Sequence, residues 1–185
     1  MDYAEQLDFK RQRIEDAFAR IGNLSVPCLP VMGMEPPFRY RNKGAFPVGC
    51  GPQGPAIGLF ASRSHRIVPV TDCLLQSADT KNLLSAVHAY LAQSGAKPYD
   101  EKTHTGLLRH IVLRENKAGD IMLVLCINGE DIPHRSHLIM LFEFVLPQVK
   151  SIMLSINKQR TNVIMGEKSI CIYGRDHIFE TLCGL

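Results

Sequence analysis

A basic and aromatic stretch contains the residue types in this sequence that most directly suggest a chemical role. Between Pro36 and Thr71 there are five basic residues and no Asp or Glu, whereas the whole chain of 185 residues has a net charge of only +3. Basic side chains neutralise phosphates and aromatic rings stack on unpaired bases, so the stretch predicts an RNA-binding surface. The alternative is a basic face on a β-rich segment with its aromatic rings in the core. The residues concerned are Arg39, Arg41, Lys43, Arg63 and Arg66, with Phe38, Tyr40, Phe46 and Phe60 between them.

A second candidate for phosphate chemistry is a glycine motif. Gly49, Gly51 and Gly54 have the spacing of the motif that binds dinucleotides. In that motif a helix begins directly after the glycines, so that its N–H groups meet the pyrophosphate. Here Pro52 and Pro55 interrupt the segment and a strand pattern follows. We therefore predict a loop over residues 49–55 between two strands, and no nucleotide site.

The histidines and hydroxyl groups offer little for catalysis or metal binding. Seven histidines are scattered, and none is spaced with Cys or carboxylates as metal ligands are. Arg109 and His110 are neighbours in a predicted strand, so we expect them on opposite faces, with His110 as a hydrogen-bonded structural residue. Ser64 and His65 should diverge for the same reason. A small enzyme that uses Ser64, His65 or His110 would need them to converge in one pocket. We assign no catalytic residue.

The hydrophobic pattern predicts an α+β fold, with an antiparallel or mixed β-sheet, helices packed on one face, and a smaller β-rich basic segment near residues 38–72. The expected helices are 3–21, 79–95 and one that Ser136 caps and Pro147 ends. The expected strands are 38–48, 56–70, 107–114, 121–127, 151–157 and 169–173. As domains we expect an N-terminal helix (1–22), the basic segment (38–73) and an α+β body (79–185), together one compact domain.

Composition and cysteine usage restrict the class of protein. No apolar run reaches the roughly 18–20 residues that span a bilayer, so no membrane partner is expected. The N-terminus lacks the basic and apolar regions of a signal peptide, which predicts a cytoplasmic protein. Six cysteines lie far apart without a C-x-x-C pair, so we expect neither disulfides nor a self-contained zinc or iron–sulfur site.

Several segments of the chain together carry one resemblance. They are residues 9–15, 40–43, 57–60, 64–68 with Cys73, 106–114, and 157–166 leading to 173–174. In these segments the chain resembles the S-adenosylmethionine-dependent RNA uracil-5-methyltransferases of the RumA/TrmA type, especially the branch that acts on 23S rRNA. The resemblance covers nearly all of the chain, in the family's order.

The resemblance implies that the chain is the central region of such an enzyme. Family members usually begin with a small β-barrel RNA-binding domain and cysteines that hold a [4Fe–4S] cluster. They end with a Rossmann-like domain that binds the methyl donor and carries the catalytic Cys and the general-base Glu. Neither end part is present, nor is the Ser-Cys-Asn-Pro-like motif of the catalytic Cys. We therefore expect a truncated chain that folds but is inactive alone.

The resemblance also sets the cofactors that we expect. The longer protein would use S-adenosylmethionine and, where its ligands are complete, a [4Fe–4S] cluster. Cys73 matches the remaining cluster ligand of the family, but its three partners are absent here. This chain should therefore hold neither cofactor.

The function that follows is that of the substrate-RNA recognition domain of a 23S rRNA (uracil-5-)-methyltransferase. Its partner would be ribosomal RNA, and neither DNA nor a membrane is expected. The alternative is a free-standing RNA-binding or assembly module without catalytic activity. The predicted RNA-binding residues are Arg41, Lys43, Arg63 and Arg66 for phosphates, and Tyr40 and Phe60 for stacking.

Overall fold

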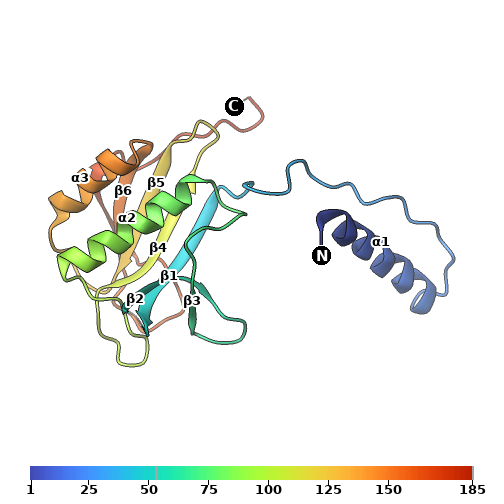
Figure 1. Ribbon diagram of the computed structural model, residues 1–185, viewed down its shortest axis with the longest axis horizontal. Coiled ribbons are helices and arrows are strands. Elements are labelled where there is room, and N and C mark those ends of the chain that lie inside the picture. Colours follow the sequence, from blue (N-terminus) through green and yellow to red (C-terminus); the bar gives the residue numbers. More distant parts are fainter. Residues whose placement is uncertain (53, 185) are drawn as a thin grey trace. The chain divides into compact units, whose positions relative to one another are not determined.

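The structure is a computed structural model that describes residues 1–52 and 54–184 (Figure 1). The chain divides into two compact units, Met1–Tyr40 and Arg41–Leu185. The prediction that residues 1–22, 38–73 and 79–185 together form one compact domain stays a prediction. Within the described residues, no helix is both long and apolar enough to cross a membrane.

The first unit contains helix α1 (Tyr3–Arg20), which confirms the helix predicted there. Its start is fixed by a capping box. The carboxylate of Asp2 accepts a hydrogen bond from the N–H of Glu5 (2.8 Å), and the carboxylate of Glu5 accepts one from the N–H of Asp2 (3.0 Å). An extended segment follows, and the N–H of Met34 donates to the hydroxyl of Tyr3 (2.9 Å). No residue of α1 is buried.

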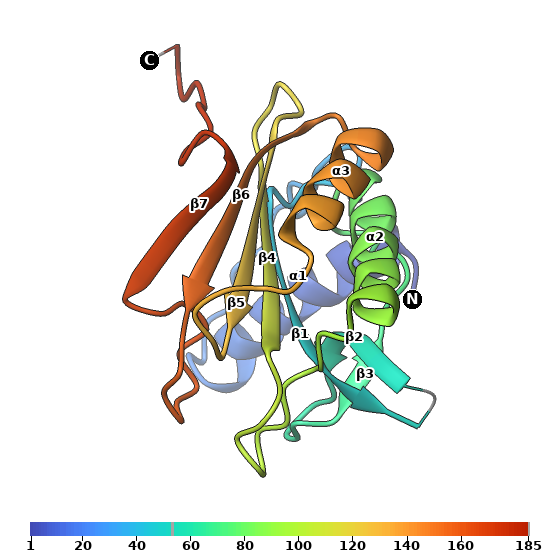
Figure 2. The same cartoon turned by 90° about the vertical axis from the view of Figure 1, so that its left-hand side faces the viewer.

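The second unit is a seven-stranded mixed sheet with two helices on one face, as the sequence predicts (Figure 2). The strand order is β3-β2-β1-β4-β5-β6-β7, and all neighbouring pairs are antiparallel except β5 and β6. The helices are α2 (Asp79–Ser94) and α3 (Arg135–Val145). The strands are β1 (Lys43–Gly51), β2 (Gly54–Phe60), β3 (Ile67–Pro69), β4 (Leu108–Glu115), β5 (Ile121–Ile127), β6 (Val149–Ile156) and β7 (Lys168–Gly174).

The basic segment is continuous with the main sheet. Strand β1 pairs with β2 on one side and with β4 on the other, with Phe46 opposite Ile111. Both of these side chains are fully buried between the sheet and the helices. The segment's position is therefore fixed by pairing with a strand more than sixty residues later, which local sequence patterns cannot reveal.

The main core lies between the sheet and helices α2 and α3. Leu83 and Val87 of α2 and Leu138 and Phe142 of α3 are all completely buried there. We call the opposite face of the sheet the second face. It holds a smaller buried cluster of Val112, Val124 and Cys126. Burial of the main core is the dominant favourable contribution to folding of this unit.

Two predicted boundaries near the glycines are wrong. The loop expected over 49–55 is mostly strand, because β1 extends to Gly51 and β2 begins at Gly54; Gln53 lies outside the described residues. No helix follows, so the hairpin reading of the glycine motif is confirmed. The strand expected over 56–70 is broken, because residues 61–66 form a turn. The N–H of Ala61 donates to the carbonyl of Arg66 (2.8 Å), and Arg63 takes a left-handed conformation (φ 56°).

The start of the third helix also differs from the prediction. Helix α3 begins at Arg135 after His134, which is left-handed, and no side chain caps it. Ser136 therefore lies within the first turn and is not the cap. The carboxylate of Asp131 organises the preceding turn instead, because it accepts hydrogen bonds from the N–H of Ile132 (2.8 Å) and from the guanidinium of Arg135 (3.2 Å).

Candidate nucleic-acid interface

Two basic residues lie side by side on the second face. Strand alternation places Lys43 on the same face as His110 and Val112, and the register sets Lys43 directly opposite Arg114. Both side chains are exposed, and neither forms an ion pair within residues 1–52 and 54–184. Like charges in a cross-strand pair repel each other. The pair is therefore suited to binding an anion.

Arg41 and Tyr40 precede this pair at the start of the sheet. Arg41 is exposed, and its N–H donates to the carbonyl of Leu75 (2.9 Å), which fixes its backbone beside the segment before α2. Tyr40 is 49% exposed and belongs to the first unit. The structure therefore brings Arg41 and Lys43 close together along the chain and leaves their side chains in solvent.

The other predicted residues gather at the turn between β2 and β3. Arg63 and Arg66 are exposed on this turn, and Phe60 ends β2 just before it. The hydroxyl of Ser64 donates to the carbonyl of Ala61 (3.2 Å) and accepts from the N–H of Arg66 (3.3 Å), so the turn is held by local hydrogen bonds. The predicted residues of the second unit are thus divided between two places, and Tyr40 belongs to the first unit.

A cavity of about 570 Å³ lies beside this turn. Its walls come from β1, the start of β3, the connection before β4, and β4 itself. Its lining includes the register position where Pro47 of β1 faces His110 of β4. Because a strand rises about 3.3 Å per residue, roughly 13 Å of β1 separates this position from Lys43. The lining residues are 47–52, Phe60, 65–67, Pro69, 99–102, Arg109 and His110.

Arg109 and His110 both line this cavity, so the expectation that they point to opposite faces is wrong. The reason is a β-bulge. The pairing of β4 with β5 shifts between Leu108 and His110, so Arg109 has no partner residue in β5. A bulge inserts one extra residue and interrupts strict alternation.

Arg109 anchors the segment between β6 and β7. The residue is buried (4% exposed), and its Nη1 donates hydrogen bonds to the carbonyls of Asn157 (2.7 Å) and Gln159 (2.8 Å). Its Nη2 donates to the carbonyl of Thr161 (3.1 Å), and the guanidinium carbon lies 4.5 Å from the ring centre of Tyr99. The guanidinium of Arg109 is therefore directed at groups of the protein itself and is not available to an RNA phosphate.

His110 is a neutral histidine in the cavity wall. Burial, helped by the positive charge of Arg109, lowers the pKa of His110 to about 4. Its Nδ1 has no hydrogen-bond partner among the described residues. This differs from the predicted hydrogen-bonded structural role. A buried polar atom without a partner carries a desolvation cost.

Three rings lie close together at the cavity. The ring of Phe60 lies 5.4 Å from that of His65 and 6.4 Å from that of His110, between ring centres. His65 also contacts the carboxylate of Glu101, with Nδ1 2.6 Å from the carboxylate oxygen. His65 and His110 therefore lie in the same cavity, as the alternative of a small enzyme that uses these histidines would require. Ser64 is not among the residues that line the cavity.

The acidic side chains around the cavity have partners within the protein, whereas two basic ones form no ion pair among the described residues. Glu101 is paired with His65, and the carboxylate of Asp100 accepts hydrogen bonds from the N–H groups of Lys102 (2.8 Å) and Thr103 (3.4 Å), which lower the pKa of Asp100. Lys102 and Arg66 are exposed, and neither forms an ion pair with any residue that the structure describes. Two cations are therefore available at the rim.

The residues present do not fit an iron–sulfur cluster. Such clusters need several thiolate ligands close together. Cys73 is half-buried, but the described residues contain no group of three or more His, Cys, Asp or Glu side chains that could hold a metal ion. No step of any reaction is therefore assigned to a metal in this chain.

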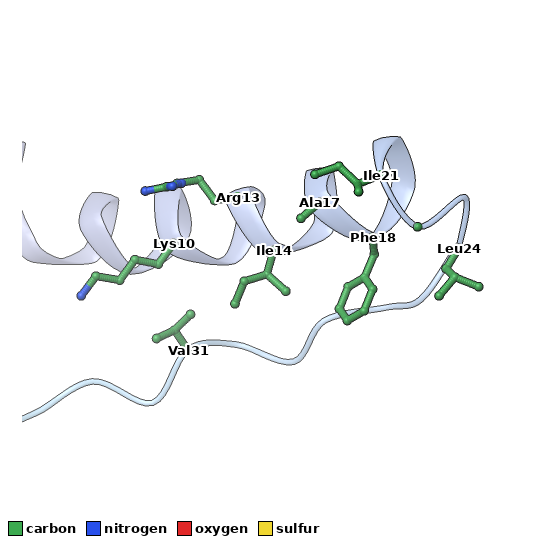
Figure 3. Close-up of a pocket in the computed structure, with 9 residues that line it drawn as sticks. Lys10, Arg13, Ile14, Ala17, Phe18, Ile21, Leu24 and Val31 are labelled. Carbon is green, nitrogen blue, oxygen red and sulfur yellow. The ribbon is translucent and has the colours of Figure 1, made fainter.

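A hollow of different chemistry lies in the first unit (Figure 3). It has a volume of about 780 Å³ and runs along α1, where Ile14 and Phe18 point towards the extended segment near Val31. Lys10 and Arg13 are its basic lining residues. Because its surface is mostly hydrocarbon, it offers few hydrogen-bonding groups to orient a nucleotide.

Sequence reasoning missed Arg114 and Lys102 as basic surface residues. Arg114 lies opposite Lys43 only because β1 pairs with β4, and this pairing joins segments about seventy residues apart. Lys102 reaches the cavity on the connection before β4. Period-two alternation along β4 was the one available signal, since it places Arg114 on the face of His110 and Val112.

Comparisons with known proteins identify what the chain resembles. It is 39% identical over 184 residues to an uncharacterized RNA methyltransferase of Halalkalibacterium halodurans, covering 98% of this chain and 40% of that protein. It is 39% identical over 181 residues to one of Clostridium tetani, covering 97% of this chain and 39% of that protein. It is 37% identical over 186 residues to one of Listeria innocua, covering 100% and 41%. No protein-family model matches the chain.

A solved structure shares the fold. The tRNA (uracil-54, C5)-methyltransferase of Pyrococcus abyssi, in complex with S-adenosyl-L-homocysteine, matches with a TM-score of 0.71 and 22% sequence identity. The match covers 97% of this chain and 40% of that one. The chain is therefore similar along nearly its whole length to proteins named RNA methyltransferases, and it spans about 40% of the length of these relatives.

Proposed function

We propose that this chain is the RNA-recognition region of an S-adenosylmethionine-dependent RNA uracil-5-methyltransferase that acts on 23S rRNA in the cytoplasm. The observation that carries the proposal is the 39% identity to a protein named an RNA methyltransferase over 98% of this chain. The motifs quoted above favour the uracil-5 and 23S branch. The exposed basic residues support a role in binding RNA.

The contribution of this chain would be to hold the RNA around the target base. Arg41 and Lys43 would contact phosphates at one place, and Arg63 and Arg66 at another. Phosphate contacts of this kind position a nucleic acid without reading its sequence. Tyr40 and Phe60, both partly exposed, would stack on unpaired bases.

The methyl-transfer chemistry would belong to the remaining part of the longer protein. There a thiolate adds to C6 of uracil, which activates C5 to attack the donor methyl group, and a base then removes the C5 proton. The target base must leave its stack to reach the thiolate. We expect the present chain to be inactive alone, to bind no donor, and to contribute at most Cys73 to a cluster in the longer protein.

A free-standing RNA-binding or assembly module is the second candidate. One observation favours it: within the described residues, the sheet of the second unit and helices α2 and α3 enclose a buried apolar core. A Ser-Cys-Asn-Pro-like motif downstream in the same gene would decide for the methyltransferase. A stop codon directly after this chain would decide for the module.

The proposed function is tested by titrating the chain with a 23S rRNA hairpin, a transfer RNA and S-adenosylmethionine. We expect salt-sensitive binding of the ribosomal hairpin and no binding of the donor. Arg41→Glu should weaken binding of all RNA sequences alike, because a phosphate contact carries no sequence information. Donor binding, or an equal preference for transfer RNA, would contradict the assignment.

A further inference from the structure

The cavity beside the β2–β3 turn has the size of a ligand site. Its volume of about 570 Å³ lies within the usual range of roughly 300–1,000 Å³ for small-molecule sites. Gly49 and Gly51 form part of the β1 wall, so the backbone itself borders the cavity there. A cavity of this size can enclose a single nucleotide, whereas a double helix cannot enter it.

One wall presents rings. Phe60, 39% exposed, has His65 at 5.4 Å and His110 at 6.4 Å between ring centres. The rings of Phe60 and His65 are tilted by 58° and those of Phe60 and His110 by 77°, so they do not stack on one another face to face. Aromatic faces of this kind are the platforms on which unpaired bases stack.

The same wall contains a polar group that the protein leaves without a partner. His110 is more than nine-tenths buried, lines the cavity, and has no hydrogen-bond partner for Nδ1 among the residues described. Nδ1 itself is covered by protein atoms. The polar edge of a base would supply donors and acceptors to the imidazole in the cavity wall.

The rim supplies positive charge. Arg66 and Lys102 are exposed and unpaired in the part of the chain that is described, whereas the nearby acids Asp100 and Glu101 already accept hydrogen bonds. An anionic group at the rim would meet the two cations, while the Asp100 and Glu101 carboxylates are directed at hydrogen-bond donors of the protein itself. The arrangement matches a nucleotide, which has a flat polar base and a charged phosphate.

We propose that this cavity binds one unpaired nucleotide of the substrate RNA, with its base against Phe60, His65 and His110 and its phosphate beside Arg66 and Lys102. The inference rests on the proposed function, and it adds that the chain recognises RNA structure by capturing a nucleotide outside a helix. The cavity would thus have a different role from the Lys43–Arg114 pair, which would contact the phosphates of paired and unpaired RNA alike.

The test compares two RNAs of equal length and charge, one a hairpin with unpaired loop nucleotides and the other fully paired. Phe60→Leu should weaken binding of the looped hairpin by about 5- to 100-fold, the effect of losing one stacked base, and should leave binding of the paired RNA unchanged. Phe144→Leu is the matched control, because Phe144 is 89% exposed on α3. It should change neither affinity.

A second measurement does not depend on a variant. A looped hairpin with 5-bromouridine in the loop should form a photocrosslink to the peptide that contains Phe60 or His65. Crosslinks elsewhere only, or an equal effect of Phe60→Leu on both RNAs, would overturn the cavity assignment while RNA binding by the chain stands. If the wild-type chain binds neither RNA, the proposed function itself fails.

Discussion

At the scale of single residues, Arg109 shows how a basic side chain can serve the fold and not the ligand. Its guanidinium donates to three carbonyls of the segment after β6. A lysine at this position keeps the charge but has one nitrogen in place of the planar fork. Arg109→Lys should therefore lower the free energy of unfolding by about 2–3 kcal/mol, because buried carbonyls lose their donors. Urea denaturation measures this change.

The control for this substitution lies on the same strand. Arg114→Lys changes an exposed side chain on β4 and should shift the free energy of unfolding by less than about 0.5 kcal/mol. Equal effects of the two substitutions would show that the guanidinium of Arg109 is not the anchor described here.

His110 predicts a dependence of stability on pH. Its pKa in the folded protein is about 4, below the ordinary value of 6.5, so between these values the unfolded chain binds more protons. Stability therefore rises with pH through this window and is lost on acidification. From pH 7 to pH 5 the loss from this group should be about 1–2 kcal/mol.

The measurement is urea denaturation at both pH values, for the wild type and for His110→Gln. The variant should lose less stability on acidification than the wild type. Contacts with Lys158 and Arg135 lower the pKa values of Glu130 and Asp131, and both proteins share these contacts, so the comparison isolates His110. An identical pH dependence in the two proteins would contradict a buried neutral His110.

At the scale of elements, the position of β3 depends on a close approach to β2. A Cβ atom added at Gly58 would lie 1.9 Å from the carbonyl oxygen of Val68. Gly58→Ala should therefore separate β3 from β2 and displace the turn that carries Arg66. We expect a loss of about 1–3 kcal/mol in the free energy of unfolding, as for other steric overpacking.

The matched control is Gly51→Ala. A Cβ atom there would lie 3.2 Å from the Cβ of Ala56, which requires only a small adjustment. Hydrogen exchange of the β3 amides should increase in Gly58→Ala and stay near the wild-type rate in Gly51→Ala. Unchanged protection in Gly58→Ala would mean that β3 tolerates the side chain and that our account of this strand pair is wrong.

The long periodic elements were predictable because their signals are local. Leu83, Leu84, Val87 and Leu91 repeat with helical spacing, and Gly95, left-handed at φ 71°, ends α2 as expected. The turn at residues 61–66 was missed because the segment contains no Gly, Pro, Asn or Asp, the residues that signal turns most strongly. The β1–β4 pairing and the bulge at Arg109 depend on contacts across the fold, and no local pattern specifies them.

At the scale of the whole molecule, charge placement matters more than net charge. A net charge of +3 on 185 residues gives only weak general attraction to RNA. Lys43 and Arg114 instead hold two positive charges at one cross-strand pair. The fold tolerates this repulsion, and a bound phosphate would relieve it. A surface selected only for stability would carry opposite charges at this pair.

The most direct test of the central claim, that this chain binds RNA through placed cations, is the salt dependence of binding to a 23S rRNA hairpin. The double variant Lys43→Gln, Arg114→Gln is compared with the wild type and with Lys81→Gln, an exposed change on α2. We predict that the double variant folds with equal or slightly higher stability, binds more weakly, and has a slope of log affinity against log salt smaller by about 1–2. Lys81→Gln should match the wild type. Equal slopes in all three proteins would contradict the account, because RNA binding would then not depend on this surface.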